Sequence, residues 1–181
     1  INFIGHRYMI DRFLETGALR RGSTIGMISS AAGLGWESNL GVLNEYLDTH
    51  DFDAATKWAV DSGRADYWWS KQAMCAYIAR EAMGFLKQGI RLNGICPGPT
   101  DTPLAQANKE MWLGFGADYR EEVGIEASTP QEQAYPLVFL CSDAAGAIAG
   151  QTIITDGGYF PSGVTGVFPD ATPMVNMLLG R

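Results

Sequence analysis

Two side chains that can exchange protons, Tyr67 and Lys71, lie four residues apart. On a helix, residues i and i+4 share one face, so this spacing lets a phenol and an ammonium point into the same pocket. A phenol has an ordinary pKa of ~10, and it becomes a base near neutrality only when a neighbour such as an ammonium stabilises its anion. The pair therefore predicts a proton-transfer site, while the alternative is a solvated helix face.

Apolar runs with turn residues at their ends surround this pair. Residues 21–30 have the pattern of a short buried strand that ends in two serines. A second run, 89–98, is broken by Pro-Gly, and a third, 151–158, is closed by two glycines. With helices expected at 66–87 and 129–142, strands and helices alternate, which predicts a parallel α/β sheet.

Five segments of the chain resemble, in the same order, signatures of the short-chain dehydrogenase/reductase family. They are residues 1–5, residues 28–33, the Tyr67/Lys71 pair, residues 93–103 and residues 156–158. Their joint occurrence covers nearly the whole chain and is far more specific than any one of them. The resemblance implies a doubly wound, Rossmann-like parallel sheet of which this chain is the C-terminal two-thirds.

The resemblance implies catalytic roles for four residues. Tyr67 would act as the general acid/base that takes the alcohol proton in oxidation and returns it in reduction. Lys71 would stabilise the tyrosinate and hydrogen-bond the nicotinamide ribose, so it also belongs to the cofactor site. Ser30 would donate to the substrate oxygen, and Asn2 would hold a water that links Lys71 to solvent. Structural alternatives are a strand-end cap for Ser30 and a helix N-cap for Asn2.

The cofactor that the resemblance implies is NAD or NADP. The residues matching the family's nicotinamide segment are Pro97, Gly98, Thr100 and Thr102. The sequence lacks both the glycine-rich phosphate loop with which family members open and the residue that reads the adenosine ribose. We therefore expect 1–181 to be one dinucleotide-binding and catalytic domain that lacks roughly 80 to 90 N-terminal residues. The choice between NAD and NADP stays open.

An insertion narrows the resemblance. Ser30 and Tyr67 are 37 positions apart, so residues 36–63 add about two dozen residues to the usual family spacing. This resembles the subgroup of 3α-hydroxysteroid dehydrogenases/carbonyl reductases and aromatic-alcohol dehydrogenases. The insertion could be a surface excursion, a subunit interface or a substrate lid, and we favour a lid that meets a second lid segment, 103–127.

The implied substrate is an apolar secondary alcohol or ketone, such as a hydroxysteroid or an aromatic alcohol. Besides Ser30, the residues expected to contact it are Trp36, Trp69, Trp112, Leu113 and Phe115. Two other functions remain open. An epimerase or dehydratase would retain its cofactor, whereas a dehydrogenase would release reduced cofactor during turnover. An inactive cofactor-binding regulatory protein would have no physical need for a charged lysine beside a phenol.

Composition limits the remaining function classes. A net charge of −7 argues against a nucleic-acid partner, and no apolar run approaches the ~20 residues of a membrane span. The three cysteines share no CxxC spacing, which favours free thiols in a reducing compartment such as the cytoplasm. The two histidines lie apart from any metal-ligand pattern, so we expect no metal. From the family we expect a homodimer or homotetramer.

Overall fold

A parallel three-stranded sheet forms the centre of the computed structural model, which describes residues 2–181. The strands β1 (Thr24–Ile28), β2 (Arg91–Pro97) and β3 (Thr152–Thr155) lie in this order, with Ile25 opposite Leu92 and Gly94 opposite Thr152. Because β2 is central and covered on both faces, Leu92 through Cys96 are buried. The predicted parallel α/β sheet is confirmed.

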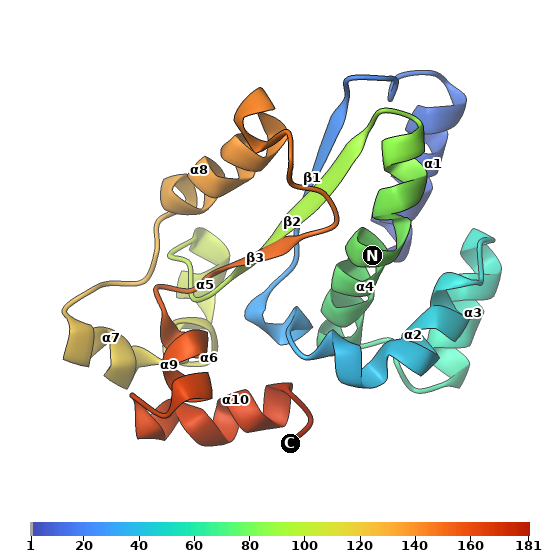
Figure 1. The fold of residues 1–181 in the computed structure, drawn as a ribbon. Coiled ribbons are helices and arrows are strands. Elements are labelled where there is room, and N and C mark those ends of the chain that lie inside the picture. The colour runs from blue at the N-terminus through green and yellow to red at the C-terminus, as the bar shows by residue number, and fades with distance from the viewer. Residues whose placement is uncertain (1) are drawn as a thin grey trace.

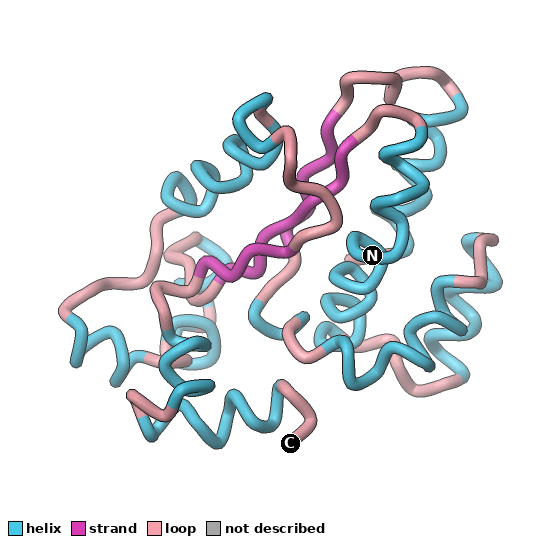
Figure 2. The backbone as a smooth tube through the Cα atoms, viewed as in Figure 1, coloured by secondary structure: helices cyan, strands magenta, loops and turns pink. Residues whose placement is uncertain are grey.

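Helices cover both faces of the sheet. Figure 1 shows α1 (Ile4–Glu15) and α4 (Tyr67–Lys87) on one face and α8 (Pro130–Cys141) on the other. In Figure 2 the strands run side by side between these helical layers. The expected helices at 66–87 and 129–142 correspond to α4 and α8. Within residues 2–181, no helix combines the length and apolar character that crossing a bilayer requires.

Side-chain caps explain where the helices begin. The Asp66 carboxylate accepts a hydrogen bond of 2.8 Å from the Trp69 backbone N–H and so fixes the first turn of α4. Thr129 and Glu132 form a reciprocal capping box at the start of α8, followed by a proline at the first helical position. This confirms the α8 start expected from the sequence and places Tyr67 in the first turn of α4.

The insertion consists of the turn η2 (Trp36–Asn39) and the helices α2 (Leu40–Leu47) and α3 (Phe52–Asp61). Its apolar side chains contact the core: Leu43 is fully buried, and the Tyr46 and Phe3 ring centroids are 5.7 Å apart. A lid would turn these side chains toward the substrate cleft, whereas in the structure they pack on the core. The face of the core formed by α1 and α4 supplies the apolar surface that they need.

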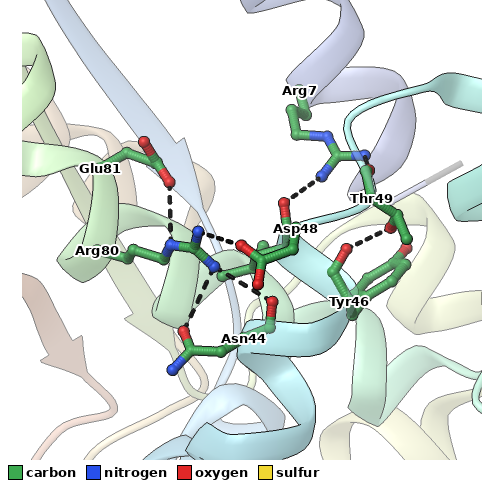
Figure 3. Close-up of polar contacts among 8 residues, drawn as sticks. Arg7, Asn44, Tyr46, Asp48, Thr49, Arg80 and Glu81 are labelled. Carbon is green, nitrogen blue, oxygen red and sulfur yellow. Dashed lines mark hydrogen bonds and ion pairs between the residues drawn. The ribbon is translucent and has the colours of Figure 1, made fainter.

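Two arginines tie the insertion to its neighbours (Figure 3). The Arg7 guanidinium is buried and donates to the Leu47 and Thr49 carbonyl oxygens, at 3.3 and 2.5 Å. Arg80 of α4 donates to Asp48 at 2.5 Å and to the Asn44 carbonyl at 3.2 Å. Because Arg7 satisfies carbonyl groups at the C-terminal end of α2, it also complements the dipole of that helix.

Short helices follow the carboxyl ends of the strands. They are α5 (Pro103–Ala107), α6 (Lys109–Leu113), α7 (Ala117–Val123), α9 (Tyr159–Thr165) and α10 (Thr172–Leu178). They gather at this end of the sheet (Figure 1), and α5, α6 and α7 lie within the segment 103–127. Residues 159–181, which have no strong period in the sequence, also form helices. These helices pack on an aromatic cluster that includes Tyr119 and Tyr159, with ring centroids 5.7 Å apart.

The C-terminal segment contacts the turn that follows β1. Gly35 has a left-handed backbone (φ +73°), and a Cβ at this position would lie only 1.6 Å from the Leu178 carbonyl oxygen. Nearby, the Ser38 hydroxyl donates to the Leu179 carbonyl at 2.9 Å. Only a glycine permits this backbone approach, which joins the end of α10 to the start of the insertion.

Candidate active site

The predicted site residues Ser30, Tyr67 and Pro97 lie at the carboxyl edge of the sheet. Ser30 follows β1, Pro97 ends β2, and Tyr67 begins α4. In open parallel sheets this edge is where ligands bind, because the strands end there and the following loops leave a crevice. The alternation of strands and helices thus brings together residues that are far apart in the sequence.

Tyr67 and Lys71 share one face of α4, as their spacing predicts. The Lys71 ammonium lies 5.5 Å from the centroid of the Tyr67 ring and donates to the Ile28 carbonyl at 2.9 Å. Burial lowers the pKa of Lys71, while the nearby Cys75 and Cys96 sulfurs oppose this shift. No hydrogen bond within residues 2–181 engages the Tyr67 hydroxyl, which therefore remains available to a ligand.

Two neighbouring serines at the end of β1 have different environments. The Ser30 side chain is partly exposed, and its oxygen accepts from the Ala32 backbone N–H at 3.2 Å. The Ser29 side chain is buried and donates to the Lys71 carbonyl at 3.0 Å. The Ser29 hydroxyl thus fastens the end of β1 to α4, whereas the Ser30 hydroxyl contacts the backbone of its own turn. Neither the type nor the spacing of Ser29 indicates this positioning role in the sequence.

The segment after β2 approaches β3 closely. A Cβ at Gly98 would lie 2.8 Å from the Asp156 Cβ, so the backbone packs as tightly here as only glycine allows. The Thr100 hydroxyl donates to the Gly98 carbonyl at 3.1 Å. The Thr102 oxygen instead accepts from the Ala105 N–H at 3.1 Å and caps α5. Pro97 is partly buried at the end of β2.

The proposed water-holding residue, Asn2, lies outside this cluster of contacts. Asn2 is exposed, and its backbone carbonyl oxygen lies 2.7 Å from the His6 ring nitrogen. Among the described residues, no hydrogen bond joins the Asn2 side chain to Lys71. The residue before α1 is Phe3 and provides no side-chain cap, so the structure does not place Asn2 as the N-cap of α1.

The residues expected to contact the substrate differ in their surroundings. Trp112 packs edge to face on Tyr67, with ring centroids 5.6 Å apart, while Leu113 is buried and Phe115 packs on Tyr159 at 4.9 Å. Trp36 is partly buried and packs at the base of the insertion.

Trp69 belongs to the other side of α4. Its ring stacks on Trp58 of the insertion with 6.3 Å between centroids, and the Arg64 guanidinium lies 4.9 Å from its centroid. Its indole N–H is buried with no hydrogen-bond partner among the described residues. Trp69 was expected to contact the substrate, but in the structure its ring packs between α4 and α3.

Comparisons with known proteins agree with the fold. Residues 51–160 match a family model described as "Enoyl-(Acyl carrier protein) reductase". The chain is 32% identical over 166 residues to the 3-alpha-hydroxysteroid dehydrogenase/carbonyl reductase of Comamonas testosteroni, covering 87% of this chain and 63% of that protein. It is 26% identical over 165 residues to the coniferyl-alcohol dehydrogenase of Pseudomonas sp. (strain HR199), with the same two coverages.

A solved structure of a dehydrogenase has a similar fold. The crystal structure of the 3-alpha-hydroxysteroid dehydrogenase from Pseudomonas sp. B-0831, complexed with NADH, matches with a TM-score of 0.60 at 26% identity. The match covers 82% of this chain and 59% of that one. The chain therefore spans somewhat less than two thirds of the length of these relatives.

Proposed function

Since this chain belongs to the short-chain dehydrogenase/reductase family, we propose that the complete protein transfers a hydride between NAD or NADP and an apolar secondary alcohol or ketone. The observation that carries the proposal is the pairing of the Lys71 ammonium with the Tyr67 ring, together with the hydrogen bond from Lys71 to the end of β1, the strand that Ser30 follows. The names of the relatives support a hydroxysteroid or an aromatic alcohol as the substrate.

The Ser30 and Tyr67 hydroxyl groups would have different roles in the reaction. The Ser30 oxygen accepts from the backbone, so its own proton is free to donate to a substrate oxygen. Tyr67 would take the alcohol proton in oxidation, and the neighbouring Lys71 ammonium would stabilise the resulting phenolate. Asn2 would hold the water that carries protons from Lys71 to solvent.

The residues after β2 fit the nicotinamide end of a dinucleotide. Gly98 leaves no side chain where the backbone packs closely, and the Thr102 hydroxyl, as an acceptor from Ala105, keeps its proton for a carboxamide oxygen. The Thr100 proton is already donated to Gly98, so Thr100 would contribute backbone groups, as would Pro97. The bound dinucleotide supplies the hydride chemistry, while Lys71 would hydrogen-bond its ribose.

Trp112 would form the apolar wall nearest to the reacting atoms, because its ring already contacts Tyr67 and is 39% exposed. Leu113 and Phe115 would extend this wall through the segment 103–127, which would act as the lid. A homodimer or homotetramer in the cytoplasm completes the proposal, consistent with the three free cysteines.

Two substitutions in the complete protein test the division of roles. With 1-phenylethanol as substrate, Tyr67→Phe should lower kcat by about 10²- to 10⁴-fold and leave the dinucleotide Kd nearly unchanged, because only the proton is lost. Lys71→Met should weaken both. Tyr135→Phe, in an exposed tyrosine of α8, is the matched control. Equal losses of dinucleotide affinity in the Tyr67 and Lys71 variants would contradict the proposal.

A further inference from the structure

Two free cysteines lie against each other directly beneath the catalytic pair. The sulfur atoms of Cys75 in α4 and Cys96 in β2 are 3.7 Å apart, and both residues are buried. The third cysteine, Cys141, lies in α8 on the opposite face of the sheet. The pair thus bridges the two elements that carry the catalytic residues and the nicotinamide segment.

Helical spacing connects this thiol pair to the catalytic side chains. Tyr67, Lys71 and Cys75 are spaced at i, i+4 and i+8, so they form one stripe along α4. Cys75 donates to the Ser29 hydroxyl at 3.2 Å, and Ser29 in turn donates to the Lys71 carbonyl. Cys96 immediately precedes Pro97. Any covalent change at the thiols therefore acts on the site from both elements.

The surroundings also favour reaction at one sulfur. The hydrogen bond from Cys96 lowers the pKa of the Cys75 thiol, with burial opposing this shift, whereas the same hydrogen bond and burial raise the pKa of Cys96. The partly buried Lys71 ammonium also attracts a negative charge on Cys75, as a cation does at reactive cysteines. The Cys75 sulfur also contacts the Ser29 hydroxyl at 3.2 Å, so we assign the attack to Cys75, and Cys96, 3.7 Å away, is placed to resolve its oxidised product.

We propose that Cys75 and Cys96 form a reversible disulfide that switches the proposed activity off under peroxide stress. The Cys75 thiolate attacks hydrogen peroxide, breaking the O–O bond to give a sulfenic acid and hydroxide, which takes up the thiol proton as water. The Cys96 sulfur then attacks the Cys75 sulfur, and the oxygen leaves with the Cys96 proton as a second water. Two thiols are oxidised and one peroxide is reduced, and an external dithiol reverses the reaction.

The geometry explains why this bond would affect catalysis. A disulfide brings its sulfurs to ~2.05 Å, so the present 3.7 Å separation must shorten by roughly 1.6 Å. That movement removes the Cys75 donor from Ser29 and draws α4 toward β2. Misplacement of catalytic groups by about 1 Å can cost ~10²-fold in rate, so we expect a loss of at least about tenfold.

Peptide mapping of the complete protein tests the disulfide without any assay of activity. The reduced protein is treated with hydrogen peroxide and digested without reductant, and a Cys75–Cys96 linked peptide lacking two hydrogen atoms is expected. Cys141→Ala should leave this peptide unchanged, while Cys75→Ala and Cys96→Ala should abolish it. If wild-type protein keeps both thiols reduced, or links either one to Cys141, the proposal is overturned, whatever the enzyme's reaction proves to be.

The regulatory part rests on the proposed function and is tested by turnover of 1-phenylethanol before oxidation, after oxidation and after dithiothreitol. We expect a loss that dithiothreitol restores in wild type and in Cys141→Ala, and no loss in Cys75→Ala. A linked peptide with unchanged turnover would refute the switch. Absence of turnover from the untreated protein would contradict the proposed function instead, while leaving the mapped disulfide to stand by itself.

Discussion

Replacing Gly35 with alanine should release the C-terminal segment from the turn that carries Ser30. Gly35 and Gly63 both have left-handed backbones, with φ +73° and φ +68°, but only Gly35 meets another atom. Nothing lies within 4 Å of a Cβ added at Gly63. Gly63→Ala therefore measures the cost of the backbone conformation alone, which is about 1–2 kcal/mol.

Gly35→Ala must also move the end of α10. The added Cβ would lie 1.6 Å from the Leu178 carbonyl oxygen, so this carbonyl has to retreat and the Ser38–Leu179 hydrogen bond is lost. Losing that bond costs about 1 kcal/mol. Exposing the buried Leu178 side chain costs about 2 kcal/mol more. We therefore expect Gly35→Ala to lose about 3 kcal/mol more than Gly63→Ala.

Urea unfolding of the complete protein measures both losses, and limited proteolysis reports whether the tail detaches. Gly35→Ala should unfold at lower urea and become sensitive to cleavage near residues 172–181. If the two variants unfold within about 0.5 kcal/mol of each other and resist protease equally, α10 does not dock on Gly35 and the reasoning fails.

Three further predictions concern the insertion and the site. Leu43→Ala should lower the free energy of unfolding by about 2–5 kcal/mol in urea titrations without changing KM. The control Leu40→Ala, at an exposed leucine, should change neither the free energy of unfolding nor KM. If Leu43→Ala instead raises KM for bulky ketones and leaves stability unchanged, the insertion acts as a lid. Gly98→Ala should weaken dinucleotide binding at least about tenfold by calorimetry, because the Cβ would meet Asp156. Burial lowers the pKa of Lys71 in the folded protein below its ordinary value of 10.5. Between the folded pKa and 10.5 the unfolded chain binds more protons than the folded protein, so the free energy of unfolding should rise with pH in this range. Lys71→Met should flatten this rise.

Local sequence signals predicted the elements of the fold because each signal acts within a few residues. The Thr129 cap and the Pro-Gly break after β2 mark element ends without reference to the rest of the chain. The spacing of Tyr67 and Lys71 likewise needed only the helical period. These features, together with the family signatures, were sufficient to predict the parallel sheet and to place Tyr67 and Lys71 at its edge.

The packing of the insertion and the C-terminal helices could not be predicted in this way. Helix α10 is seven residues long, which is too short to be stable by itself, so it depends on distant partners such as Tyr119. The insertion has an apolar face, but the sequence does not say which surface that face covers. Trp69 is different, because it lies two residues, or about 200°, around α4 from Tyr67, and helical geometry alone could have excluded it from the cleft.

The position of Ser30 is set by close backbone packing on both sides of its turn. On one side, a Cβ at Gly33 would lie 2.8 Å from the Lys71 carbonyl and 2.6 Å from the Ser29 hydroxyl, so the turn rests directly on α4. On the other side, Gly35 rests on the end of α10. The Ser30 hydroxyl itself has only a local backbone partner, which leaves its proton free. Gly33 and Gly35 thus hold the turn that carries Ser30 between α4 and the end of α10, through backbone contacts that do not use the Ser30 hydroxyl.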